Sequence, residues 1–158
     1  MPAPLASLLA PDVLLDLFDA LPETMFYVKD TRGRYVTVNR TMLDRSGLSR
    51  REDVLNRTAA DLFPGALGEN YTRDDLLVIA RGEAIRDRLE MYHPQRGRGA
   101  SVNVGWCLTH KLPLRDPSGV VVGLAGVSRD LPRPDERSQT YAQVASVAAR
   151  VRASPGEP

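Results

Sequence analysis

The chain has 158 residues, of which 42% are hydrophobic and 26% are charged, a balance typical of one globular domain with a single core. Its formal net charge of +1 excludes a strong electrostatic attraction to nucleic acid or acidic membrane. A single cysteine excludes an internal disulfide and fits a reducing compartment. Because no apolar run approaches the roughly 18 residues of a membrane span, and residues 1–10 contain neither Lys nor Arg, we expect a cytoplasmic protein without a membrane partner.

The first predicted element is an amphipathic helix over residues 12–21. Its apolar side chains recur at helical spacing, while Pro11 suits the first turn and Pro22 stops the helix. Two β-rich runs, residues 25–29 and 34–38, flank a glycine turn and therefore predict a hairpin.

Several helices are predicted after the hairpin. Asn39 can cap a short helix that Gly47 closes. Two capping-box patterns, at residues 49–52 and 58–61, predict further short helical turns. Residues 66–81 then predict a longer helix, which a glycine ends.

Three strands complete the predicted sheet. In the first, from Ile85 to Met91, apolar and charged residues alternate, and Asp87 is the one charged residue on the apolar side. The third runs over residues 120–128. The second strand has two distinct faces, with Val102, Val104, Trp106 and Leu108 on one, and Asn103, Gly105, Cys107 and Thr109 on the other.

The element order predicts an α+β fold, a five-stranded antiparallel sheet with short helices on one face. We expect a cap helix within residues 1–22 and the sheet domain over 23–131. A proline-rich linker and a C-terminal helix with a thin apolar stripe are expected over 132–158.

Two strand–turn–strand segments carry a resemblance to a known family. One runs from Lys29 to Asn39 and the other from Lys111 to Leu131, each around a glycine turn. Together with the elements between them, they resemble a PAS domain over roughly residues 12–131. PAS domains are small sensory modules, so the resemblance implies binding and signalling in place of catalysis. It also implies a pocket between the sheet and the helices.

The resemblance implies positions for a ligand pocket and for an interface. The pocket candidates lie on the last three strands and are Asp87, Met91, Asn103, Cys107, Thr109 and Ser128. The outer sheet face would take the N-terminal helix or a second subunit, through Val13, Leu14, Leu17 and Phe18 of the helix and Val102, Val104, Trp106 and Leu108 of the sheet. Because this apolar face is wider than the helix, we expect a homodimer.

No cofactor and no metal are expected. The Asn-Cys-Arg-Phe motif of flavin photosensors does not occur, and residues 66–82 lack the histidine that haem-binding members carry on their long helix. One cysteine and two separated histidines do not form a metal-site pattern.

Single residues leave alternatives open. Asp87 suits a ligand contact, and it also suits an ion pair with an arginine at the sheet edge. Cys107 fits a small core residue better than a reactive one, and Trp106 fits an outer-face anchor better than a ligand stack. The arginines of residues 86–98 alternate with acidic residues, as on a solvated strand face.

The tail carries a second resemblance. Residues 141–150, followed by Pro155 and Glu157, are similar to the lead-in to an AraC-type helix-turn-helix domain. This implies the sensor half of a transcription regulator, which would contact DNA only through a domain absent from this chain. The alternatives are the input domain of a sensor kinase or similar signalling protein, a small cavity enzyme that uses Asp87, and a dimerisation module with a filled core.

Overall fold

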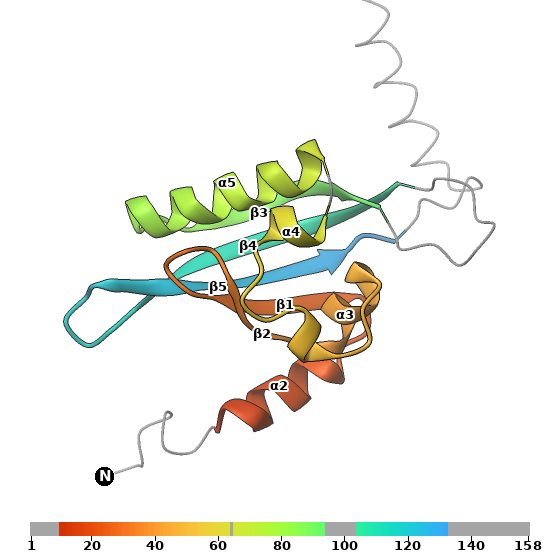
Figure 1. Ribbon diagram of the computed structural model, residues 1–158, viewed down its shortest axis with the longest axis horizontal. Helices are drawn as coiled ribbons and strands as arrows, with labels where there is room; N and C mark the ends of the chain where they lie inside the picture. Colours follow the sequence, from red (N-terminus) through yellow and green to blue (C-terminus); the bar gives the residue numbers. More distant parts are fainter. Residues whose placement is uncertain (1–9, 64, 94–103, 133–158) are drawn as a thin grey trace, which may run out of the picture.

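A computed structural model describes residues 10–63, 65–93 and 104–132. These residues form one five-stranded antiparallel sheet in the order β2-β1-β5-β4-β3, with helices packed against it (Figure 1). The elements in chain order are α2 (Pro11–Asp19), β1 (Thr24–Lys29), β2 (Tyr35–Val38), α3 (Arg40–Ser46), η1 (Arg51–Asp53), α4 (Ala59–Leu62), α5 (Ala66–Arg81), β3 (Ile85–Tyr92), β4 (Gly105–Arg115) and β5 (Val121–Asp130). The predicted α+β fold class is confirmed. The expected C-terminal helix lies outside the described residues.

The helices lie on both sides of the sheet. Figure 1 shows α5 along one side and α2 on the opposite side, next to β1 and β2. Helix α5 packs against β4 and β5, and α3 packs against β1. Helix α2 contacts β1 and α3, so it covers only one end of the outer face.

Local sequence explains where the helices begin and end. The side chain of Asn39 accepts a hydrogen bond from the Met42 N–H and caps α3, and Gly47 closes the helix at φ 70°. Thr58 and Asp61 form the predicted capping box of α4. The capping box predicted from Ser49 is wrong, because the short helix η1 starts one residue later and has no side-chain cap.

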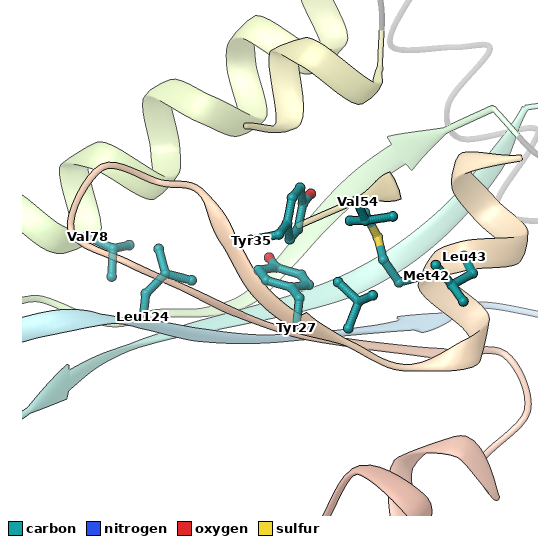
Figure 2. Packing of buried hydrophobic residues seen from close by; sticks show 8 residues of the cluster. Tyr27, Tyr35, Met42, Leu43, Val54, Val78 and Leu124 are labelled. Carbon is teal, nitrogen blue, oxygen red and sulfur yellow. The ribbon is translucent and has the colours of Figure 1, made fainter. Parts of the chain in front are cut away.

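The hydrophobic core lies between the β1–β2 hairpin, β5 and the helices (Figure 2). Figure 2 shows the rings of Tyr27 and Tyr35 rising from the hairpin toward α5. The ring centroids are 5.7 Å apart and the rings meet edge to face. The buried cluster consists of Tyr27, Tyr35, Val38, Met42, Leu43, Val54, Val78 and Leu124. It leaves the inner face of β3 and β4 to polar side chains.

Strand β4 reaches Arg115, as the predicted strand before the turn at residues 117–119 requires. It continues past Thr109 to Arg115 even though it contains Pro113, which has no N–H to donate. Strand β3 begins at Ile85, opposite Lys111, so no strand is paired with β4 on that side at the proline. The proline is therefore tolerated and the strand reaches its full length.

Candidate functional site

A cavity of about 300 Å³ lies between the inner face of the sheet and the helices. All five strands contribute to its wall, together with α3, α5 and the residues that flank α4 and β3. The lining residues are Met25, Tyr27, Lys29, Tyr35, Arg45, Phe63, Leu67, Tyr71, Asp75, Glu90, Tyr92, His93, Cys107, Lys111 and Ser128. A volume of this size lies at the lower end of small-molecule sites, about 300–1,000 Å³.

One wall of the cavity carries a buried group of three charges. Asp75 of α5 is 0% exposed and bridges Lys29 of β1 and Lys111 of β4. The Lys111 Nζ lies 2.7 Å from Asp75 Oδ1, and the Lys29 Nζ contacts the other carboxylate oxygen. Two ammonium groups therefore share a single carboxylate. When all three side chains are ionised, this wall has an excess of positive charge.

Aromatic rings compensate part of the cost of burying these lysines. The Lys29 ammonium lies 4.0 Å from the centroid of the Tyr35 ring, and the Lys111 ammonium lies 5.9 Å from that of Tyr71. Burial lowers the pKa of Lys29, and the carboxylate of Asp75 partly opposes that shift. Each ammonium has three N–H donors, and the Lys29 ammonium donates to a single carboxylate. Donor capacity thus remains on the cavity wall.

A second wall presents a carboxylate whose two oxygens differ. The Thr109 hydroxyl donates to Glu90 Oε2 over 2.9 Å, and Ser128 Oγ lies 2.9 Å from Thr109 Oγ1. The Cys107 thiol lies 3.7 Å from both the Glu90 backbone oxygen and Thr109 Oγ1. Within the described residues, Glu90 Oε1 is buried and accepts no hydrogen bond. The cavity therefore contains an acceptor that no described residue satisfies.

A third group joins the cavity to the end of the last strand. Arg45 forms an ion pair with Asp130, the final residue of β5, and its guanidinium stacks 4.0 Å from the Tyr92 ring centroid. The Tyr92 hydroxyl donates to Asp130 Oδ2 over 2.7 Å. Burial and this carboxylate raise the pKa of Tyr92 to about 12. A shift of Arg45 or Tyr92 in the cavity would thus act directly on the end of β5.

Glycines on paired strands make room for two of the tyrosines. Tyr27 is paired with Gly126, and Tyr92 is paired with Gly105. A Cβ atom at either glycine would overlap the facing ring. Each ring covers the glycine of the next strand, an arrangement that also fixes the strand register. Burial raises the pKa of Tyr27 well above its usual range.

The predicted pocket residues divide into two groups. Cys107 and Ser128 lie on the cavity wall, and Thr109 is buried on the same sheet face, hydrogen-bonded to Ser128. Burial raises the pKa of the Cys107 thiol, as expected for an inert residue. Asn103 lies outside the described residues.

The inward placement of Asp87 and Met91 is wrong. Met91 is paired with Trp106, which lies on the outer face. Because directly opposed residues share one face of a sheet, Met91 also lies on the outer face, and it is 37% exposed. The Asp87 side chain is 78% exposed and lies 3.5 Å from His110 Nε2. Its backbone has φ 50°, within an irregularity of the β3–β4 register, which upset the alternation assumed from the sequence. Glu90 and Tyr92 face the cavity instead.

The predicted cap-helix interface is also only partly formed. Phe18 of α2 stacks on Phe26 of β1 with ring centroids 4.0 Å apart, and Leu14 is half-buried. Val13 and Leu17 remain 46% and 57% exposed. Helix α2 does not cover β4, since Trp106 and Val104 are 47% and 39% exposed, and Leu108 is half-buried. Val102 lies outside the described residues.

Sequence reasoning missed the charged residues of the cavity. Lys111 continues the inward alternation of Cys107 and Thr109 along β4. Lys29 follows Tyr27 with the spacing of one strand face. Asp75 lies one helical turn before the buried Val78. In each case the spacing alone could have shown a charged side chain pointing inward.

Two features are absent from the described residues. No helix there is long and apolar enough to cross a bilayer. No group of three or more His, Cys, Asp or Glu side chains in that part of the chain could hold a metal ion.

The family follows from a comparison with known domains. A family model described as PAS fold matches residues 18–134. The chain belongs to the PAS fold family. Among curated proteins, none matches this chain significantly.

Solved structures of other PAS domains have the same fold. The Vibrio cholerae VqmA dimer, described as a LuxR-type receptor, has a TM-score of 0.62 at 24% identity, over 78% of this chain and 52% of that one. VqmA bound to DPO has a TM-score of 0.61 at 24% identity, over 75% of this chain and 56% of that one. The PAS domain of Bordetella pertussis BvgS has a TM-score of 0.58 at 22% identity, over 88% of this chain and 96% of that one. This chain spans little more than half the length of the VqmA structures.

Proposed function

We propose that this PAS domain is a cytoplasmic sensor that binds a small molecule in its cavity and regulates transcription. The observation that carries the proposal is the cavity itself, whose walls carry lysine ammonium groups with further N–H donors and a Glu90 oxygen that has no hydrogen-bond partner among the described residues. A core that only held the fold together would bury apolar side chains there, because unpaired polar groups are costly to bury.

Binding would shift a population between two arrangements of the domain. The cavity contacts Arg45 and Tyr92, and both bind Asp130 at the end of β5. A ligand that moves either side chain changes how Asp130 is held. The effect would pass to the linker that follows the strand, and from there to the downstream domain.

The solved relatives support this role. One VqmA structure carries DPO, and VqmA is described as a dimer with a target DNA. The tail of this chain is instead similar to the lead-in to an AraC-type domain, so we propose a transcription regulator of either class. DNA would be contacted only through a domain outside this chain. The input domain of a sensor kinase is the second candidate.

We also propose a homodimer through the outer sheet face. The exposed apolar side chains of β3 and β4, which include Leu89, Trp106 and Leu112, lie on the face that α2 leaves open. A partner copy could cover this face, as the exposed stripe of α2 also suggests.

Binding is proposed in place of catalysis because the one carboxylate considered for a cavity enzyme, Asp87, lies outside the cavity. The lysines and the arginine on the wall form ion pairs, Lys29 and Lys111 with Asp75 and Arg45 with Asp130, and the remaining carboxylate, Glu90, accepts a hydrogen bond from Thr109.

Native mass spectrometry of the freshly purified chain, with an absorption spectrum of the same sample, tests the proposal. We expect one small bound mass per chain, or a mass shift on incubation with cell extract metabolites. A bare protein that takes up no small molecule in either experiment would contradict the sensor function. Visible absorbance would instead show a coloured cofactor and overturn the expectation of none.

A further inference from the structure

We infer that the tail of this same chain, residues 137–152, docks on the outer side of α5, in a groove between α4 and α5. The groove is lined by apolar side chains of both helices, with two charged residues of α5 at one end. The tail lies outside the described residues, and its amino-acid sequence matches the groove in spacing, size and charge. The inference goes beyond the proposed function, because it requires no ligand in the cavity.

Within the described residues, the groove is an apolar surface without a cover. Leu76 and Leu77 of α5 are 43% and 39% exposed, and Ala60 of α4 and Ala80 of α5 are exposed beside them. The Thr72 hydroxyl accepts a hydrogen bond from the Ala60 N–H over 2.9 Å, which ties the two helices together. Apolar side chains that gather on one exposed groove indicate an interaction surface.

Helix α5 has two faces with different partners. Asp75 is buried on the face that packs against the sheet. The groove residues of α5 recur at helical spacing on the opposite face, and they include Glu69, Arg73, Leu76 and Ala80. The outward leucines therefore contribute nothing to the core of the domain.

The tail sequence has an apolar stripe with the same spacing. Its members are Tyr141, Val144, Ala145 and Ala148, and Arg137 precedes them by one helical turn. An α-helix over the tail would place these five side chains on one face. Because most of them are small, such a helix would bury little area alone and requires a partner surface.

The centres of the two stripes are complementary in size. In a parallel alignment the small Val144 and Ala145 face the larger Leu76 and Leu77, and one turn later alanine faces alanine. Small residues opposite large ones allow two helices to interdigitate closely. The tail would thus cover the two exposed leucines.

The charged ends of the stripes match in the same alignment. Arg137 would lie beside Glu69, and Tyr141 would lie beside Arg73. The first contact is an ion pair, and the second is a cation–π contact. Such contacts fix the register of an interface more than they add to its affinity.

The connection from the sheet favours the parallel orientation. Figure 1 shows β5 ending at the end of the sheet where α5 begins, next to α4. Five residues lead from Pro132 to Arg137, and they span at most about 17 Å. An antiparallel tail would have to begin at the far end of the groove, beyond a further length of about 16 Å from Glu69 to Ala80. The short connection therefore suits a tail that starts beside Glu69.

A spin label on the tail of the full chain tests the inference. Cys107→Ser removes the single cysteine, and Ser146→Cys places the label on the side of the tail opposite the stripe. Methyl NMR spectra with isotope-labelled leucines are compared before and after reduction of the label. We expect Leu76 and Leu77 to lose most of their methyl intensity while the label is active. The methyl signals of Leu112, on the outer sheet face, should keep theirs.

Two matched substitutions distinguish the groove from a general apolar attraction. Leu77→Asp should restore the Leu76 methyl signal, because a carboxylate in the groove opposes burial under the tail. Leu112→Asp makes the same change at a side chain that is 38% exposed, against 39% for Leu77, and it should leave the signal loss as it was. Equal effects of the two substitutions would contradict docking in the groove.

Reversal of one charge pair tests the register. Glu69→Arg should reduce the loss of the Leu76 and Leu77 methyl signals, because it places two cations side by side. Adding Arg137→Glu to the same chain should bring the loss back. A double variant that behaves like Glu69→Arg alone would overturn the parallel alignment.

The remaining outcomes identify other occupants. Unchanged signals of Leu76 and Leu77 would overturn the inference, and a loss at Leu112 in their place would put the tail on the outer sheet face. In a mixture of spin-labelled chains and separate isotope-labelled chains, a loss at Leu76 would show that the groove holds the tail of a second copy. That result would contradict docking within one chain. None of these outcomes alters the bound mass expected in native mass spectrometry, so this inference and the sensor function fail independently.

Discussion

Replacing Asp75 with Asn removes the one carboxylate that two buried lysines share. Asp75 is 0% exposed, and Lys29 and Lys111 are 2% and 1% exposed, so water cannot replace it. Asparagine has nearly the same shape and keeps one acceptor oxygen, so the substitution changes mainly the charge. The variant would hold two ammonium groups close together without a counter-ion.

The expected loss follows from measurements on buried ion pairs. Removing one partner of such a pair typically costs about 3–5 kcal/mol of unfolding free energy, because the other charge stays buried and unpaired. Domains of this size are stable by only about 5–15 kcal/mol, so Asp75→Asn should remove a large share of the total. Urea unfolding followed by circular dichroism measures the difference, with the slope of the transition as a check on two-state behaviour.

A neighbouring residue gives the matched control. Asp74→Asn makes the same change one position earlier on α5, where Asp74 pairs with Arg88, whose side chain is 45% exposed. An exposed pair of this kind contributes about 0–1 kcal/mol. The reasoning would be refuted if Asp75→Asn cost no more than Asp74→Asn.

The pH dependence gives an independent test of the same variant. Burial lowers the pKa of Lys29, and Asp75 opposes that shift, so the pKa should fall further when the carboxylate is removed. Between the lowered pKa and the usual value of 10.5, the unfolded chain binds the extra proton. The unsubstituted chain shows the same rise above its own Lys29 pKa, so the stability of the variant relative to it should rise with pH only between the Lys29 pKa of the variant and that of the unsubstituted chain. A constant difference at all pH values would contradict this assignment.

Three further predictions concern the cavity wall and the outer face. Gly126→Ala should cost about 1–3 kcal/mol of unfolding free energy in urea titrations, because the added Cβ displaces the Tyr27 ring; an unchanged midpoint would contradict the close packing. Since the pKa of Tyr92 is raised from 10.0 to about 12, the unfolded chain loses this proton first and stability should fall as pH rises between these values. That fall should be smaller in Tyr92→Phe, and an equal fall in the two proteins would show that another group is responsible. Trp106→Ala, or removal of residues 1–21, should shift a dimer toward monomer in light scattering, because Trp106 is 47% exposed on the open face; an unchanged dimer would place the interface elsewhere.

Local chemistry made most of the fold predictable. Asn39, Gly47 and the Thr58–Asp61 capping box each fix a helix end through contacts within a few residues. Strand alternation also predicted that Cys107 and Thr109 lie on the buried face, because successive side chains of a strand point to opposite faces. Among the described residues, the helix start predicted at Ser49 is misplaced, because η1 begins at Arg51 with Arg50 before it and has no side-chain cap.

The cavity was harder to predict because its contacts are distant in sequence. Asp75 meets Lys29 and Lys111 across 46 and 36 residues, and no local pattern reports such a pairing. Apolar residues on a strand predict its buried face, yet Leu89 and Met91 of β3 are 56% and 37% exposed, so this rule fails for β3. On β3 and β4 the inner face is polar and the outer face is apolar. The polar inner face is explained if it lines the cavity, and the apolar outer face is explained if it forms an interface.

The most direct test of the account compares bound ligand in two neighbouring variants. Cys107→Met extends a side chain into the cavity, whereas Leu108→Met makes a similar change on the opposite face of the same strand. We predict that native mass spectrometry shows a bound small molecule on the unsubstituted chain and on Leu108→Met, but none on Cys107→Met. A bound mass that persists on Cys107→Met would place the ligand outside the cavity and contradict the central claim.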